Sequence, residues 1–199
     1  GVGIFVKKMI DDAPQISPNK VRPNSFASVV LDQSGKELDK FVESGSNRIY
    51  KTIDEIPEYL QHAFVAVEDE RFYEHNGIDL QGILRAGIIG ITSGGNFSQG
   101  ASTLTQQLIK NNVFPDFLHE KTFYDSLQRK VQEWYLSIKI EKQMDKKEIM
   151  ENYLNTINLG QNTLGVQSAS KRYFNKDVSE LTLSECSVIA SITQNPSGL

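Results

Sequence analysis

Apolar residues recur every three or four positions through most of the chain after residue 57, which is the spacing of amphipathic α-helices. Start signals and periodicity predict helices that begin near Pro57, Ile83, Thr103, Phe123, Lys146, Val166 and Leu183. Before residue 57, the segments 26–31 and 37–43 flank a turn that contains Gly35, and they predict a β-hairpin. The chain is therefore expected to be mainly α, and its 199 residues suit one domain with room for two lobes.

The start of the chain allows two interpretations. Residues 1–6 are apolar and precede Lys7 and Lys8, as at the end of a membrane-spanning helix or in an ordinary short apolar segment. No stretch reaches the roughly 20 apolar residues that a membrane-spanning helix needs. Residues 11–24 contain three prolines and little periodicity, so we expect an extended stalk there.

The segment 68–77 places a carboxylate where an apolar residue is expected. Glu68 follows Phe64 by four positions, on the apolar stripe of the predicted helix. Burial disfavours the ionised form of a carboxyl group, and proteins use this effect to tune such groups for general acid or base catalysis. The alternative is a helix end rich in solvated acids, with Gly77 as the stop signal. The spacing alone leaves both interpretations open.

The segment 83–91 is apolar almost throughout, apart from Arg85. A buried helix leading to a loop would have this composition. So would a mobile apolar flap that contacts lipid, with Arg85 at the level of the headgroups.

Residues 100–110 combine helix-capping residues with a polar helix face. The hydroxyls of Ser102 and Thr103 are natural N-caps, and the N-terminus of a helix attracts anions. If a helix begins near Thr103, then Gln107 and Lys110 lie three positions apart and share a face.

The segment 123–143 has the strongest amphipathic pattern in the chain. Its expected apolar stripe consists of Leu127, Val131, Trp134, Tyr135 and Ile138. The polar residues Arg129, Lys130, Glu133 and Ser137 fall off that stripe, and an i,i+4 pair such as Arg129 with Glu133 is usually a solvated surface contact.

Composition narrows the classes of partner. The net charge of −4 does not favour a nucleic-acid-binding protein, so any anionic ligand must be met by a local cluster of basic residues. Cys186 lies in an apolar run and is expected to be a small core residue. One cysteine cannot form an internal disulfide.

Five segments in this order carry a family resemblance. The first two are the most specific and read Glu68-Asp69-x-x-Phe72-x-x-His75-x-Gly77 and Gly100-x-Ser102-Thr103-x-Thr105-Gln106-Gln107-x-x-Lys110. The others lie at 129–133, 148–155 and 181–185. Over nearly its whole length the chain resembles the peptidoglycan glycosyltransferase domain of class A penicillin-binding proteins.

The resemblance implies a lysozyme-like glycosyltransferase fold with a large helical lobe, a small membrane-proximal mobile lobe and a short N-terminal β-hairpin. Residues 1–24 would be the membrane-proximal stalk and residues 25–199 the glycosyltransferase domain. Within that domain, 25–50 would contain the hairpin and 78–101 the mobile, membrane-facing segment. The implied reaction polymerises lipid II into β-1,4-linked glycan strands, with inversion and release of undecaprenyl pyrophosphate.

The resemblance also assigns roles to residues. Glu68 would be the general base on the acceptor's 4-hydroxyl, and Glu133 would be the second essential acid, acting on the pyrophosphate directly or through Mg²⁺ or Mn²⁺. No organic cofactor is implied. The residues that would bind substrate are Asp69, Phe72, His75, Ser102, Thr103, Gln106, Gln107, Lys110, Arg129 and Lys130.

The implied partners are lipid II, the nascent glycan strand and a membrane surface, without nucleic acid. The parent protein would be a bifunctional one, held in the cell membrane by a single N-terminal anchor, with the catalytic domain on the extracytoplasmic face. A phosphoglycolipid of the moenomycin type would be the expected inhibitor class.

Three features depart from the family pattern. Gly90 stands where the family often carries Asn, and the turn 160–165 lacks the usual aromatic residue. The connection from Lys110 to Arg129 is longer than usual and contains Pro115. Two other functions remain open on the sequence: a lysozyme-like enzyme that cleaves glycan, and a non-catalytic membrane-proximal binding module.

Overall fold

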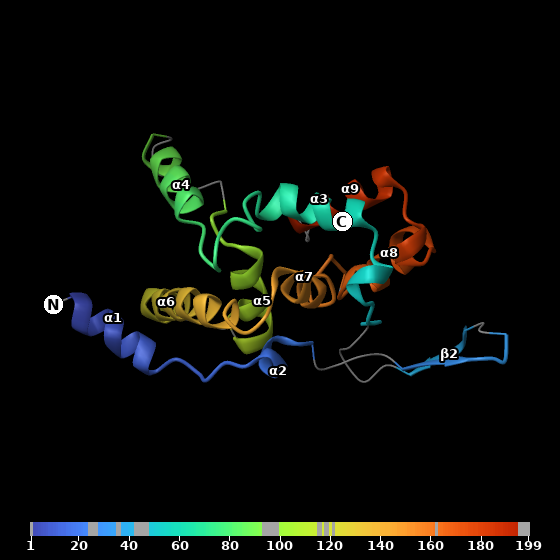
Figure 1. The fold of residues 1–199 in the computed structure, drawn as a ribbon, viewed down its shortest axis with the longest axis horizontal. Coiled ribbons are helices and arrows are strands. Elements are labelled where there is room, and N and C mark those ends of the chain that lie inside the picture. The colour runs from blue at the N-terminus through green and yellow to red at the C-terminus, as the bar shows by residue number, and fades with distance from the viewer. Residues whose placement is uncertain are drawn as a thin grey trace. The chain divides into compact units, whose positions relative to one another are not determined.

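The computed structural model describes residues 2–23, 28–34, 37–41, 48–92, 100–114, 117, 120, 122–161 and 163–194. In these residues the chain is mainly helical, which confirms the predicted fold class at that level (Figure 1). The chain divides into two compact units. Unit 1 comprises residues 1–21 and 68–149, and unit 2 comprises residues 22–67 and 150–199.

Unit 1 contains α5 (Leu104–Val113) and α6 (Phe123–Ile140), which carry six of the predicted site residues. Its other named helices are α1 (Val2–Asp11), α2 (Pro18–Val21), α4 (Leu80–Thr92) and the first four residues of α7 (Lys146–Leu154). Helix α1 packs on α6 and α2 packs on α5 (Figure 1). The buried apolar side chains of this unit are Met9, Val21, Phe72, Leu104, Leu108, Ile109, Leu136, Ile140, Met144 and Ile149.

The segment expected to be an extended stalk is folded onto unit 1. The carbonyl of Met9 accepts a 2.8 Å hydrogen bond from Gln132 Nε2, and the carbonyl of Val21 accepts one of 2.6 Å from Asn112 Nδ2. Both Met9 and Val21 are buried. Pro14 lies between α1 and α2, and Pro18 is the first residue of α2. The two short helices pack on α6 and α5, and each places one buried apolar side chain, Met9 or Val21, in the core of unit 1.

Unit 2 contains the strand pair and the C-terminal helices. Strand β1 (Ser28–Leu31) pairs antiparallel with β2 (Glu37–Phe41), with a register irregularity between Val30 and Leu31. Gly35, Lys36 and the outer ends of the predicted strands lie outside the described residues. The remaining elements are η1 (Ile53–Glu55), α3 (Glu58–Glu68, to Val67), the end of α7, α8 (Val166–Phe174), η3 (Val178–Glu180), α9 (Leu183–Ser191) and η4 (Ile192–Gln194).

Local capping signals fix the helix starts that the sequence predicts. Thr103 caps α5 by accepting a hydrogen bond from the backbone N–H of Gln106, and Thr182 caps α9 in a capping box with Glu185. Helix α3 begins directly after Pro57, and α8 spans the predicted residues. Cys186 is buried in α9, as expected.

Helix α4 is not a buried helix. Its side chains at Leu80, Leu84 and Ile88 are 69, 67 and 63% exposed and recur every four residues. The buried-helix interpretation of the segment 83–91 is therefore wrong for the described side chains. Within the described ranges, no helix is both long and apolar enough to cross a membrane.

The apolar stripe predicted for α6 does not match its buried face. Leu127 and Ile138 are each 39% exposed, whereas Gln132, Glu133 and Ser137 are buried. Periodicity located the helix correctly but chose the wrong face, because it cannot recognise polar side chains that become buried on finding partners.

Candidate active site

A buried carboxylate joins the turn after α3 to the start of α5. Asp69 accepts hydrogen bonds from His75 Nε2, at 2.9 Å to Oδ1 and 3.0 Å to Oδ2, and from the backbone N–H of Leu104 at 2.9 Å. The backbone N–H of Gly77 donates to His75 Nδ1 at 3.1 Å, which places the imidazole proton on Nε2. The Asp69 carboxylate therefore fixes the N-terminus of α5 against this turn.

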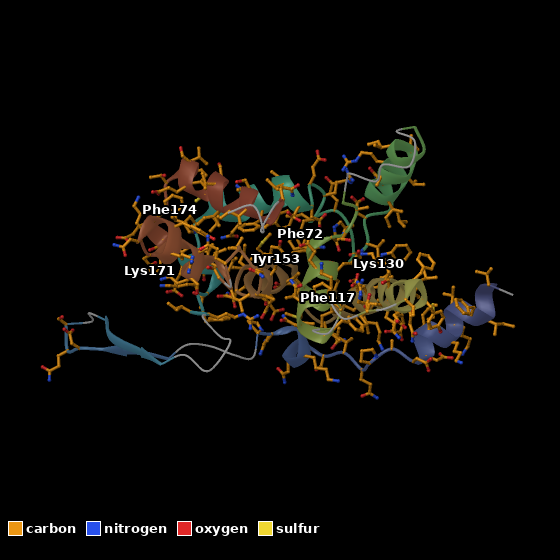
Figure 2. All side chains as sticks on the ribbon, turned by 180° about the vertical axis from the view of Figure 1, so that it is seen from behind. Phe72, Phe117, Lys130, Tyr153, Lys171 and Phe174 are labelled. Carbon is orange, nitrogen blue, oxygen red and sulfur yellow. The ribbon has the colours of Figure 1, made fainter. Side chains whose placement is uncertain are left out.

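Gly77 makes a second connection between the turn after α3 and the start of α5. Its φ of 93° lies in the left-handed region, and its carbonyl accepts hydrogen bonds from Thr103 Oγ1 at 2.9 Å and Gln106 Nε2 at 3.1 Å. Phe72, which Figure 2 labels, is fully buried. The ammonium of Lys146 lies 4.5 Å from its ring centroid. These contacts anchor the turn without leaving Phe72 open to a ligand.

Glu68 is the last residue of α3 and is half-buried. Gln107 Nε2 donates a 2.8 Å hydrogen bond to its Oε2. Glu68 lines a small pocket with Ser102 and Thr103, and Ser102 also lines the larger pocket described next. The hydrogen bond with Gln107, rather than complete burial, orients the Glu68 carboxylate.

A pocket of about 270 Å³ lies between α5 and α6, and we call it the cation pocket. Lys130 Nζ donates hydrogen bonds to Ser102 Oγ at 2.7 Å, to Glu133 Oε2 at 3.1 Å and to Gln106 Oε1 at 3.3 Å. The residues that line the pocket are Ser102, Gln106, Gln107, Lys110, Phe117, Arg129, Lys130 and Glu133.

Arg129 is held in this pocket by the carboxylates of Glu133 and Glu120. Glu133 is buried, and its Oε1 accepts a hydrogen bond from Arg129 Nη1. The Nε and Nη2 groups of Arg129 donate to the two carboxylate oxygens of Glu120, the second contact being 3.2 Å long. The guanidinium of Arg129 lowers the pKa of Glu120, so this carboxyl group stays ionised.

Lys110 is held differently from the other two cations. It has no ion pair or hydrogen bond among the described residues, and its ammonium lies 5.0 Å from the centroid of the Phe117 ring. Burial is the main cause that lowers the pKa of Lys110, the charge of Glu133 opposes it, and Lys130 and Arg129 lower the pKa further. Lys110 therefore brings a positive charge to the pocket that no carboxylate bonds directly.

All twelve predicted site residues lie in unit 1. Seven of them line the cation pocket: Ser102, Gln106, Gln107, Lys110, Arg129, Lys130 and Glu133. Glu68 lies beside it through its hydrogen bond with Gln107. The remaining four, Asp69, Phe72, His75 and Thr103, hold the backbone around Gly77 and the start of α5.

Sequence reasoning missed Phe117 and Glu120. Both come from the connection between α5 and α6, where no periodic pattern or motif marks them. The unusual length of this connection was the only available signal, and it did not indicate which side chains would reach the pocket.

Comparisons with known proteins show which family this chain is similar to. A family model described as Transglycosylase matches residues 34–199. The chain is 46% identical over 192 residues to penicillin-binding protein 1A of Clostridium novyi, which covers 95% of this chain and 22% of that protein. It is 41% identical over 198 residues to penicillin-binding protein 1A of Clostridium perfringens, covering 98% of this chain and 28% of the relative. Penicillin-binding protein 1A/1B of Bacillus subtilis is 38% identical over 197 residues, which cover 98% of this chain and 20% of that relative.

The helical fold, with two glutamates and three cations gathered around one helix face, is thus that of a family that forms glycosidic bonds. The chain belongs to the transglycosylase family, as the glycosyltransferase domain of a class A penicillin-binding protein. It spans between 20 and 28% of the length of the three relatives described above.

Proposed function

We propose that this chain is a peptidoglycan glycosyltransferase that polymerises lipid II into β-1,4-linked glycan strands for the bacterial cell wall. One observation carries the proposal. Gln107 bonds the Glu68 carboxylate and also lines the cation pocket with Lys110, Arg129 and Lys130. A base and a cluster of cations therefore meet along one face of α5, as a displacement of diphosphate by a sugar hydroxyl requires.

Glu68 acts as the general base in this proposal. The hydrogen bond from Gln107 to its Oε2 fixes the direction of the carboxylate, which then accepts the proton of the acceptor's 4-hydroxyl. The hydroxyl oxygen forms a bond to the donor's anomeric carbon while the bond from that carbon to the diphosphate breaks. Attack on the face opposite the leaving group inverts the configuration of the α-linked donor.

The cation pocket receives the leaving diphosphate. Negative charge grows on the diphosphate as its bond to the sugar breaks, and fixed cations stabilise that charge most when they need no rearrangement. Lys110, Arg129 and Lys130 supply the charge, while Ser102 and Gln106 offer polar groups beside it. Each charge-assisted hydrogen bond contributes about 1.5–3 kcal/mol.

Glu133 orients the cations in this scheme. Its carboxylate oxygens accept hydrogen bonds from Arg129 and Lys130, and its side chain is 1% exposed. This donor set does not favour Mg²⁺ or Mn²⁺, because both oxygens already bind cations and Glu120 is bonded to Arg129 and Ser126. Among the described residues no group of three or more His, Cys, Asp or Glu side chains is placed to hold a metal ion. The three cations alone meet the diphosphate charge in this proposal.

Helix α4 would contact the membrane that carries the substrate. A polyprenyl donor stays in the bilayer, so its enzyme needs an apolar surface next to the site. The exposed stripe of Leu80, Leu84 and Ile88 supplies such a surface, with Arg85 half-exposed beside it to reach the headgroups. The exposed stripe supports contact of α4 with the membrane surface.

Incubation of the protein with labelled lipid II tests the proposed function. Growth of a polymer that lysozyme digests supports synthesis. Shortening of a preformed glycan strand without polymer growth would show a cleaving enzyme instead. Binding of lipid II without either reaction would show a non-catalytic module.

The diphosphate role has its own test. Replacing Lys110 by Ala removes the pocket cation that no carboxylate of the described residues bonds directly, so a phosphoglycolipid of the moenomycin type should bind about tenfold more weakly. Titration of wild-type and Lys110→Ala protein with a fluorescent derivative measures the change. Equal affinities would contradict a diphosphate site at Lys110.

A further inference from the structure

Phe117 is the one lining residue of the cation pocket without a polar side chain among the residues that the structure describes. It comes from the connection between α5 and α6 (Figure 2). Its backbone N–H donates a 3.1 Å hydrogen bond to the carbonyl of Phe114, and its carbonyl accepts one of 3.5 Å from Glu120. The ring is therefore carried by a locally bonded turn and is half-buried at the pocket wall.

Two cations lie over this ring. Lys110 Nζ is 5.0 Å from the ring centroid, and Arg129 Cζ is 5.8 Å from it. Both distances fall within the range of about 6 Å over which the negative face of an aromatic ring attracts a cation.

The three cations of the pocket are held by different kinds of partner. Glu133 bonds Arg129 and Lys130, and Glu120 bonds Arg129 as well. A carboxylate partner cancels charge and occupies N–H donors. An aromatic face does neither, so no partner among the described residues occupies the N–H groups of Lys110 that can donate to phosphate oxygens.

Lys110 needs such a partner because its surroundings disfavour the charged form. Burial is the largest cause that lowers its pKa, and the neighbouring Lys130 and Arg129 lower it further, while Glu133 and Glu68 raise it. The ring adds attraction for the ammonium without adding a competing anion.

We propose that Phe117 is a positioning residue for Lys110, holding its ammonium charged at the pocket wall with its donors free for the diphosphate of the substrate. Binding of the substrate's diphosphate rests on the proposed function, whereas the effect of the Phe117 ring on Lys110 does not. Phe117 lies in the connection between α5 and α6, outside the five segments that carry the family resemblance.

Three variants of the full chain test the proposal. Phe117→Leu keeps an apolar side chain but removes the aromatic face, and Phe117→Tyr keeps the face. Tyr135→Leu is the matched control, because Lys139 Nζ lies 5.0 Å from the Tyr135 ring centroid on α6 and Tyr135 does not line the pocket.

The first measurement is the pH at which acylation of Lys110 by an amine-reactive reagent reaches half its maximal rate, followed by mass spectrometry. Phe117→Leu should move this midpoint to lower pH, because the charged form loses its ring partner. The midpoint should stay unchanged in Phe117→Tyr and Tyr135→Leu. The pH midpoint reports the protonation of Lys110, whereas a change in how easily the reagent reaches Lys110 alters only the acylation rate.

The second measurement is protection of Lys110 against acylation by inorganic pyrophosphate. Phe117→Leu should need about three- to tenfold more pyrophosphate for half-protection, and the two other variants should stay within about twofold of wild type. The KM for lipid II should rise in Phe117→Leu by the same factor, with a smaller change in kcat.

An unchanged acylation midpoint in Phe117→Leu overturns the inference, whatever happens to activity. A shifted midpoint with unchanged pyrophosphate protection also overturns it, because Phe117 would then not act on anion binding. Failure of the wild-type protein to polymerise lipid II contradicts the proposed function, while acylation and pyrophosphate protection still decide the role of Phe117.

Discussion

The amide of Gln107 donates a 2.8 Å hydrogen bond to the carboxylate of Glu68, thirty-nine positions earlier in the chain. This contact joins the end of α3 to a face of α5 that also carries Lys110. It links the proposed base to the proposed diphosphate pocket.

Replacing Glu68 by Gln should reduce polymerisation of lipid II by about 10²–10⁴-fold, because an amide cannot accept the proton of the acceptor hydroxyl. Labelled lipid II measures the rate, and thermal unfolding should show a melting temperature close to that of wild type. Glu74→Gln is the control, since Glu74 is an exposed acid in the turn that follows α3 and should keep full activity. Full turnover by Glu68→Gln would refute its role as base.

Replacing Asp69 by Ala should lower the free energy of unfolding by about 3 kcal/mol, because the backbone N–H of Leu104 and the imidazole of His75 lose their buried acceptor. Urea denaturation measures the loss. Activity should fall with it, because the start of α5 would no longer be fixed. Asp69→Asn keeps one acceptor oxygen, so its free energy of unfolding should lie between those of wild type and Asp69→Ala. A stability equal to wild type in Asp69→Ala would show that the turn is held by other contacts.

Two glycines give a matched pair of stability tests. Gly77 has a φ of 93°, and a Cβ there would come within 2.7 Å of the backbone carbon and oxygen of Ser137. Gly77→Ala should therefore destabilise the protein by about 2–4 kcal/mol. A Cβ at Gly87, within α4, would meet no atom within 4 Å, so Gly87→Ala should be neutral or stabilising by about 0.5–1 kcal/mol. Thermal unfolding of both variants measures the contrast, and a similar loss in each would contradict the strain argument.

Asp177 makes unit 2 sensitive to acid. Burial of its carboxyl group opposes ionisation, but hydrogen bonds from the backbone and hydroxyl of Ser179, from Lys51 and from Gln167 outweigh it and lower the pKa of Asp177 to about 2. The pKa of Asp177 in the folded state lies below its unfolded value of about 3.9. The ionised carboxylate therefore contributes fully to the free energy of unfolding above that pH, and this contribution is lost as the pH falls toward 2.

The Asp177→Asn variant should therefore be less stable than wild type at pH 6, and the difference should shrink as the pH falls from 4 to 2. Urea denaturation at several pH values measures both proteins. A constant difference across this range would mean that the carboxylate charge of Asp177 does not contribute.

The sequence determined whatever depends on neighbouring residues. Thr103 and Thr182 cap their helices through bonds that reach only three positions along the chain, so spacing alone located α5 and α9. For the same reason, spacing also placed Gln107 and Lys110 on one face of α5, since i,i+3 geometry follows from the helix itself. The order of the five segments then sufficed to indicate the family.

Only the tertiary structure decided which faces are buried and which side chains meet. Periodicity selected Leu127 and Ile138 for the core of α6, but Gln132 and Glu133 are buried there, because Met9, Arg129 and Lys130 supply their partners. Those partners come partly from far along the chain, and hydrophobicity does not record them. The contact of Phe117 with Lys110 could not be predicted from the sequence either, since the neighbours of an aromatic residue in an irregular connection are set only by the folded structure.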